Sequence, residues 1–167
     1  MKKIVFLIIS IIIGVLVYQK NNDIIIPKEA IRIRIIANSN NIKDLYEKEK
    51  LKREIKEDLY NYVNNINSFN EADLSIKNNL DNINQLILKK TSNFKVNYGY
   101  NYFPKKVYKG VIYPEGEYQS LVITLGEGLG DNWWCVLYPP LCMIDDNINT
   151  SDIEYRLLVT NIMKNWH

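Results

Sequence analysis

Histidine is almost missing from the sequence, since the single histidine is His167 at the end of the 167 residues. A Ser-His-Asp or Cys-His catalytic site needs an imidazole that packing holds in place, and a terminal residue is rarely held in this way. Two cysteines without histidine also cannot close a four-ligand zinc site. We therefore expect neither histidine-based catalysis nor a metal site, and no cofactor.

An excess of one charge is missing as well. The sequence has 21 Lys and Arg residues against 19 Asp and Glu residues, a formal net charge of +2. The lysines are mixed with acidic residues and form no separate basic stripe, so nucleic acid is not an expected partner. Hydrophobic residues make up 47% of the sequence, which is enough for the core of one domain.

One long hydrophobic run stands at the amino terminus. Lys2 and Lys3 precede the uncharged residues 4–18, and Gln19 and Lys20 follow them. This order is typical of an export signal, a charged region before an apolar one. A membrane-spanning helix needs about 20 residues, and polar flanking side chains that reach the bilayer surface compensate for a shorter apolar run.

The run ends without a small-x-small cleavage site, because Leu16, Val17 and Tyr18 are bulky. We therefore predict an uncleaved signal-anchor at residues 1–20, with a cleaved signal peptide and a buried core helix as alternatives. The lysine-bearing end is expected in the cytoplasm. The rest of the chain is then extracytoplasmic, where disulfides persist.

The first half of the body reads as linker, strand and helices. Pro27 and its polar neighbours indicate a linker at residues 21–29, and isoleucines that alternate with Arg32 and Arg34 predict a strand over residues 30–37 with one wet face. An amphipathic helix is predicted over residues 42–66. Its cap is Asn41, and its apolar positions are Leu51, Ile55, Leu59, Tyr62 and Ile66. One further helix, with a cap at Asn70, has the apolar positions Ile76, Leu80, Ile83 and Ile87.

The second half is rich in strand patterns. Alternation and turn residues predict strands at residues 94–103, 106–110, 117–128 and 133–139, and helical spacing predicts a third helix at residues 152–166. The expected fold of residues 30–167 is a single extracytoplasmic α+β domain. It has a largely antiparallel sheet covered on one face by helices, and the N-terminal membrane or signal helix precedes it.

The stretch "DNWWCVLYPPLC" (131–142) concentrates unusual residues. Pro139 and Pro140 bend the chain between Cys135 and Cys142, so that their Cα atoms can approach the roughly 5.5 Å that a disulfide requires. We predict this disulfide, with two unlinked buried thiols as the alternative. A catalytic thiol is not expected, because the sequence offers no base to activate it.

Trp133 and Trp134 are neighbours on a predicted strand, so their rings point to opposite faces of the sheet. One ring can enter the core, and the other faces solvent or a partner. Exposed tryptophan is enriched at binding hot spots. The simpler alternative is one core tryptophan and one that is partly covered.

Other candidates have simpler structural interpretations. The loop "GEGLG" (126–130) is similar to a phosphate loop, but it joins two strands and no helix follows it. Asp131 and the pair Asp145 and Asp146 are expected to be surface turn residues. The tyrosine-rich face of the strand at 94–103 can stack on a ligand or pack as an ordinary sheet face; it comprises Tyr98, Tyr100 and Tyr102.

The block "FPKKVYKGVIYPEGEYQSLVITLGEGLGDNWWCVLYPPLC" (103–142) resembles the signature region of the stage II sporulation protein R family. "IRIRIIANSN" (31–40) is similar to the other motif of that family, which usually has an acidic residue where this chain has Asn40. The resemblance runs from residue 31 to about 145 in the same order and at similar spacing.

This resemblance implies an intercellular signal of endospore formation. Such proteins are made in the forespore and exported into the space between the two cell membranes. There they activate by contact a membrane-embedded aspartic-type protease of the mother cell, which matures a sporulation sigma-factor precursor. The protein is then not an enzyme. Its expected membrane contact, through residues 4–18, follows from the hydrophobic run and not from the resemblance. We expect partner contacts in the aromatic block, at Trp133, Trp134, Tyr118, Asn132, Pro139 and Pro140.

Two other functions remain open from the residues alone. One is an extracytoplasmic hydrolase of cell wall or peptide that uses carboxylates without histidine, with Glu115, Glu117, Glu127 and Asp131 as candidates. The other is a structural domain associated with the cell wall. It accounts for the anchor but not for the specific aromatic block.

Overall fold

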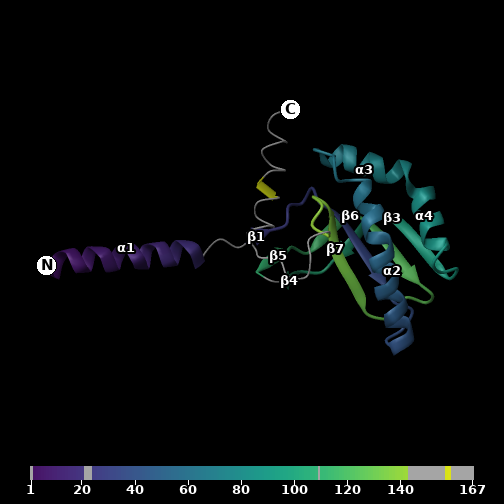
Figure 1. Ribbon diagram of the computed structural model, residues 1–167, viewed down its shortest axis with the longest axis horizontal. Coiled ribbons are helices and arrows are strands. Elements are labelled where there is room, and N and C mark those ends of the chain that lie inside the picture. Colours follow the sequence, from purple (N-terminus) through teal and green to yellow (C-terminus); the bar gives the residue numbers. More distant parts are fainter. Residues whose placement is uncertain (1, 21–23, 109, 143–156, 159–167) are drawn as a thin grey trace.

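The computed structural model describes residues 2–20, 24–108, 110–142 and 157–158 (Figure 1). Within the first helix, side chains are described for residues 3–14. The predicted third helix at 152–166 lies outside the described residues except for Leu157 and Leu158, which are helical. Asp145 and Asp146 also lie outside them.

A four-stranded sheet forms the centre of the domain, in the order β3-β6-β2-β7. Its strands are β2 (Ile31–Ile36), β3 (Phe94–Phe103), β6 (Gly116–Leu125) and β7 (Asn132–Tyr138). β6 is antiparallel to β3 and β7 is antiparallel to β2, but β2 and β6 run parallel. The sheet is therefore mixed, and the prediction of a largely antiparallel sheet is corrected. The helices after β2 lead to β3 at the edge of the sheet, and β6 then enters between β3 and β2, antiparallel to the first and parallel to the second. Alternation along a strand predicts its two faces but not its direction relative to its neighbours.

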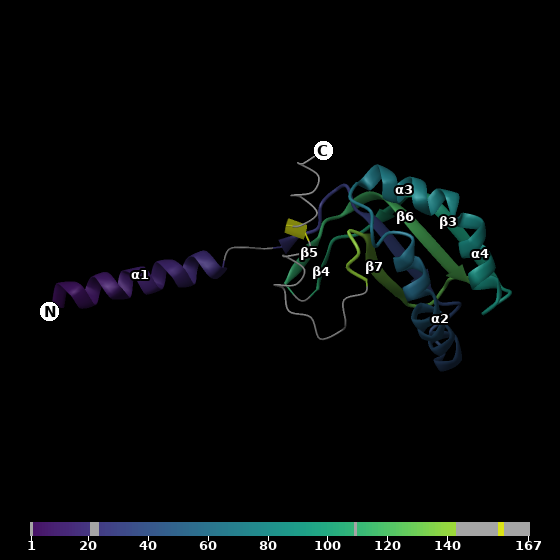
Figure 2. The ribbon, with the colours of Figure 1, turned by 45° about the horizontal axis from the view of Figure 1, so that its top comes forward.

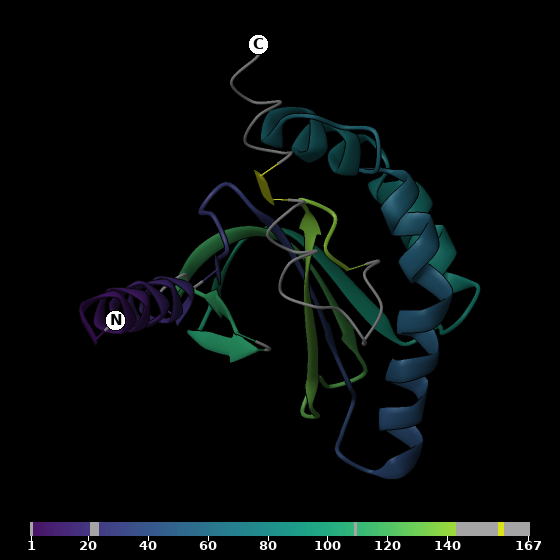
Figure 3. The same ribbon diagram turned by 60° about the vertical axis from the view of Figure 1, so that its left-hand side comes forward.

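Three helices cover one face of this sheet, as predicted (Figures 2 and 3). They are α2 (Ile42–Asn61), α3 (Phe69–Asn78) and α4 (Leu80–Leu88). The side chain of Asn41 caps α2 by accepting from the backbone N–H of Asp44. The second predicted helix is divided at Asn79, and its first part is capped by Ser68 instead of Asn70.

The main core lies between the helices and the sheet. Helical spacing of three and four residues places the apolar side chains of α2 on its inner face, and alternation does the same for β2 and β6. The fully or almost fully buried members include Leu51, Ile55, Leu59, Ile76, Ile83, Ile87, Ile33, Ile35, Leu121 and Ile123.

A small second sheet lies on the side of the large sheet away from α2 (Figures 1 and 3). Its strands are β1 (Ile24–Ile25), β4 (Lys106–Tyr108) and β5 (Val111–Tyr113), in the order β1-β5-β4. A second cluster of buried side chains joins it to β7, comprising Ile24, Ile26, Ala30, Val111, Val136 and Leu141. Part of the segment expected to be a linker, residues 24–26, is therefore folded, because three consecutive isoleucines supply apolar cover for this cluster.

The N-terminal segment forms the helix α1 (Lys2–Lys20). Its large apolar side chains between Ile4 and Ile13 are exposed. Among the described residues, none of the helices combines the length and the apolar character needed to cross a membrane. The expected membrane helix thus finds no support in the described part of the chain.

Candidate partner-binding site

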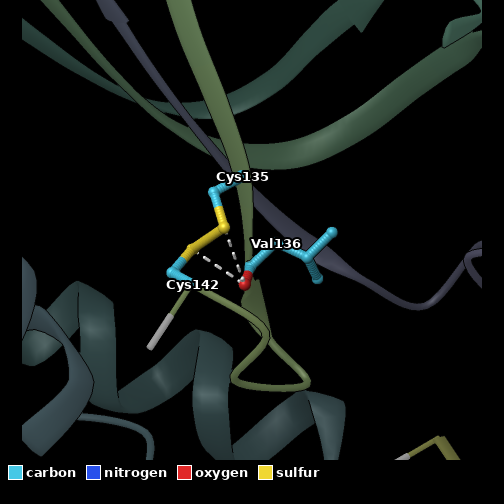
Figure 4. Close-up of a disulfide and its surroundings, with 3 residues drawn as sticks. All are labelled: Cys135, Val136 and Cys142. Atoms are coloured by element: carbon cyan, nitrogen blue, oxygen red, sulfur yellow. Dashed lines mark hydrogen bonds between the residues drawn. A yellow bond between two sulfur atoms is a disulfide. The ribbon is translucent and has the colours of Figure 1, made fainter. Parts of the chain in front are cut away.

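The end of β7 and the turn after it form a covalently closed segment. The structure joins Cys135 to Cys142 by a disulfide, as predicted, with their Cα atoms 5.5 Å apart (Figure 4). The turn between them has a cis peptide bond before Pro139, and the backbone N–H of Leu141 donates to the carbonyl of Val136. The Sγ of Cys142 lies 2.9 Å from that same carbonyl oxygen. A disulfide sulfur carries no proton, so we interpret this as a close contact and not as a hydrogen bond.

The two tryptophans lie on opposite faces of the sheet, as expected for neighbours on a strand. Trp133 is half-buried and packs against the main core beneath the helices. The Nζ of Lys52 on α2 lies 5.6 Å from the centre of its ring, within the range of a cation–π contact. Trp133 therefore helps to attach α2 to the sheet.

Trp134 is half-buried on the face without helices. Its ring meets that of Phe103 edge to face, with the centroids 5.6 Å apart. The Nζ of the exposed Lys106 lies 5.2 Å from its centre. One tryptophan packed against the core and one partly covered is the simpler of the two predicted arrangements.

Two arginines of β2 complete this face, and we name the group of Arg32, Arg34, Phe103, Tyr118 and Trp134 the arginine cluster. The guanidinium of Arg32 stacks on Tyr118 at 3.5 Å from the ring centre. Phe103 is shared, with the guanidinium carbons of Arg32 and Arg34 at 5.2 and 5.1 Å from its centre. Arg34 pairs across the strands with Trp134.

The prediction that Arg32 and Arg34 form a wet face is wrong. The exposed fraction of Arg32 is only 2%, and Arg34 is half-buried. The alternation of isoleucine and arginine indicated the two faces correctly, but no local signal showed that aromatic side chains from distant strands cover the second one. Ring contacts of this kind are the feature of the site that the sequence did not reveal.

The arginine cluster leaves polar atoms without partners. One terminal nitrogen of Arg32 donates to the carbonyl of Pro114 at 3.1 Å. The Nε atoms of Arg32 and Arg34 and the Nε1 of Trp134 are buried and have no hydrogen-bond acceptor among the described residues. Burial lowers the pKa of both guanidinium groups from its ordinary value, although nearby tyrosines partly oppose this for Arg32. Buried donors without acceptors are rare in native proteins and call for an explanation.

The other predicted contact residues differ in accessibility. Asn132 is exposed and Pro140 is half-buried, whereas Tyr118 and Pro139 are buried. Tyr118 stacks against Arg32 and is almost fully buried, so its ring is not accessible on this surface. Of the predicted set, Trp134 and Asn132 are the members that share the helix-free face and remain accessible.

The glycine loop between β6 and β7 (126–130) is held in place by side chains that precede α2. The side-chain oxygen of Asn38 accepts from the backbone N–H of Glu127, and the side-chain oxygen of Asn40 accepts from that of Asp131. Gly126 has a positive φ of 53°, and a Cβ there would collide with the side chain of Asn38. The motif after β2 thus holds this loop in place. The chain continues from the loop into the strand β7, whereas a phosphate loop continues into a helix.

The carboxylates considered for hydrolysis are not gathered at one place. Glu115 and Glu117 stand at the start of β6, while Glu127 and Asp131 follow its end, so most of this ten-residue strand lies between the two pairs. Among the described residues, no three His, Cys, Asp or Glu side chains are grouped closely enough to hold a metal ion.

On β3, Tyr98 donates to Asp73 at 2.9 Å, whereas Tyr100 and Tyr102 are exposed.

These features define a class of protein: a disulfide-containing α+β domain whose mixed sheet has helices on one face and an arginine–aromatic cluster on the other. The family model for stage II sporulation protein R matches residues 27–148. A relative, stage II sporulation protein R of Bacillus subtilis (strain 168), is 38% identical over 134 residues, which cover 76% of this chain. The chain belongs to the stage II sporulation protein R family.

The match to the Bacillus relative covers only part of the length of that protein. The aligned part covers 59% of the Bacillus relative. This chain thus spans less than two thirds of that protein. No solved structure matches the chain. Membership of the family supports a role in sporulation.

Proposed function

We propose that this protein is an intercellular signal of endospore formation that activates a membrane protease by contact. It is made in the forespore and exported into the space between the forespore and mother cell membranes. There it binds a membrane-embedded aspartic-type protease of the mother cell, which then matures a sporulation sigma-factor precursor. The observation that carries this proposal is membership of the stage II sporulation protein R family.

The features of the chain are compatible with export and contact. Lys2 and Lys3 precede an uncharged run in the order of an export signal. The disulfide between Cys135 and Cys142 suits an oxidising compartment, because cytosolic thiols are kept reduced. The candidate carboxylates lie apart, which favours binding over turnover as the mode of action.

The contact surface in this proposal is the helix-free face around Trp134. The opposite face is already covered by the helices, and Trp133 packs beneath them. Tryptophan is enriched at interface hot spots, and Trp134 is half-buried on this face. Since a ligand shifts a receptor only by binding one of its states more tightly, this face must bind the active state of the protease in preference to the inactive one.

Reconstitution of purified protein with the protease and its sigma-factor precursor tests the proposal. We expect wild-type protein to stimulate processing and Trp134→Ala to reduce the stimulation about tenfold or more, the scale of a hot-spot residue. Tyr46→Ala is the matched control, because Tyr46 is an exposed aromatic residue of α2. It should leave processing unchanged.

Circular dichroism and urea unfolding of each variant separate a lost contact from a lost fold. Normal processing by folded Trp134→Ala protein would exclude this face as the contact. Absence of any stimulation by the folded, oxidised wild-type protein would contradict the proposed function itself.

A further inference from the structure

We propose that the arginine cluster is a binding site for a carboxylate, presented by an acidic segment of the partner protein. The inference deepens the proposed function and rests on it for the choice of partner. It begins from the three buried donors of Arg32, Arg34 and Trp134 for which the described part of the chain supplies no acceptor.

The charge of this face is the first argument. Alternation along the strands places Arg32, Arg34 and Lys95 on the face without helices. None of the strand positions of the large sheet that share this face carries Asp or Glu. The exposed Lys105 and Lys106 stand beside it. A partner that complements this face is therefore negatively charged.

The cost of the arrangement without a ligand is the second argument. Burying a charged group is unfavourable unless it is paired and hydrogen-bonded. Arg32 has the ring of Tyr118 and the carbonyl of Pro114 as partners, but these satisfy neither its Nε nor its charge in full. Arg32 and Arg34 also bring two positive charges to one ring, that of Phe103. One carboxylate near both guanidinium groups would relieve both penalties.

The geometry of the donors selects the chemical class of the ligand. Guanidinium groups match carboxylates in planar, two-pronged hydrogen bonds. The unpaired nitrogens are buried, so the acceptor must be carried inward on a side chain. An Asp or Glu side chain can do this, whereas a lipid phosphate is held in the plane of its headgroups. Arg34 and Trp134 are the half-buried members of the cluster, and the Nζ of Lys106 lies 5.2 Å from the centre of the Trp134 ring.

Nuclear magnetic resonance of the 15N-labelled, oxidised full-length chain in zwitterionic detergent tests this site directly. The probe is a blocked peptide of alternating glutamate and glycine, and the matched control peptide has glutamine in place of glutamate. We expect the Nε–H signal of Arg34 and the indole signal of Trp134 to shift with the glutamate peptide only. The indole signal of Trp133, on the opposite face, should not move.

A pair of arginine variants locates the binding. Arg34→Gln should raise the dissociation constant of the glutamate peptide about tenfold, the loss expected when a charged hydrogen-bond partner is removed. Arg53→Gln, at an exposed position of α2, should leave it unchanged. Equal binding of the two peptides, or equal binding by both variants, would overturn the site.

Two further titrations and one double variant test for other occupants of the arginine cluster. Inorganic phosphate and phosphatidylglycerol vesicles are titrated in the same way, and stronger shifts with either than with the peptide would overturn the choice of a protein carboxylate. The double variant Asp145→Asn, Asp146→Asn tests whether these acidic residues of the chain itself occupy the site. Movement of the Arg34 signal in that variant without any peptide would show that the site is filled from within the chain, which also contradicts the proposal.

Failure of the site and failure of the proposed function give different results. Loss of peptide binding in Arg34→Gln decides the inference without the protease. Processing by reconstituted protease decides the function without the peptide. Peptide binding by a protein that does not stimulate the protease would therefore retain the carboxylate site and reject the signalling function.

Discussion

At the scale of single residues, Asp44 shows how a side chain can fix the junction between a strand and a helix. Its Oδ2 accepts from Asn38 and Ser39, both at 2.7 Å, and from Asn41 at 3.1 Å. Asn38 in turn holds the glycine loop through Glu127. The carboxylate therefore stands at the centre of a network that connects β2, α2 and the turn before β7.

Asp44 gives the domain a predictable response to acid. Hydrogen bonds from Ser39 and then Asn38 lower the pKa of Asp44 below its ordinary value, against a smaller opposing effect of burial. Its contribution to stability is complete above the unfolded pKa of about 3.9 and is lost as the pH falls through the lower folded pKa. Thermal unfolding between neutral and strongly acidic pH should show this loss in the wild type and a weaker one in Asp44→Asn. An identical decrease of the melting temperature with falling pH in the two proteins would show that the stability of the network does not depend on the protonation of Asp44.

At the scale of elements, the disulfide-closed segment makes a separate contribution to stability. In the chain-entropy model, a loop of this size stabilises the folded state by about 2–3 kcal/mol. The double variant Cys135→Ser, Cys142→Ser should lose about this amount from the free energy of unfolding in urea. Adding a reductant should destabilise the wild type by a similar amount and leave the variant unchanged. Equal stability of the oxidised and reduced wild type would contradict the prediction.

The elements themselves were largely predictable where periodicity is strong. Leu51, Ile55 and Leu59 indicated the inner face of α2, and alternating isoleucines indicated β2. The division at Asn79 was not predicted, because the apolar spacing runs through it and the interruption lies in the backbone. Strand direction was missed for another reason: pairing of β2 with β6 depends on tertiary packing, which no local pattern encodes.

The candidate site was predictable only in part, and for the same physical reason. Cys135 and Cys142 lie near each other in sequence, so proline chemistry and spacing sufficed to predict their disulfide. The sequence predicted that one of Trp133 and Trp134 is accessible, but not which one. The burial of Arg32 depends on Phe103 and Tyr118, which lie far from it along the chain. Such contacts follow from strand order, so a sequence pattern shows the arginines but not their cover.

At the scale of the whole molecule, residues 24–26 belong to the folded domain and not to a linker. Ile26 has an exposed fraction of 1%, whereas its neighbour Ile25 has 56%. Ile26→Ala should therefore lower the free energy of unfolding by about 2–4 kcal/mol, the cost of a cavity in a core. Ile25→Ala is the matched control and should change it by about 0.5 kcal/mol at most. Urea unfolding measures both, and equal effects would place the domain boundary after Ile26.

The position of β2 also determines when the domain can form. This strand comes first in the large sheet along the chain, yet it is hydrogen-bonded between β6 and β7, whose residues Leu121 and Cys135 pair with Ile33. Pairings so distant in sequence form late and slowly. While such a chain is threaded through a translocation pore from its N-terminal end, β2 lacks β6 until Leu125 has emerged and lacks β7 until Tyr138 has emerged. If the protein is exported as proposed, this strand order delays completion of the large sheet until most of the domain has crossed the membrane.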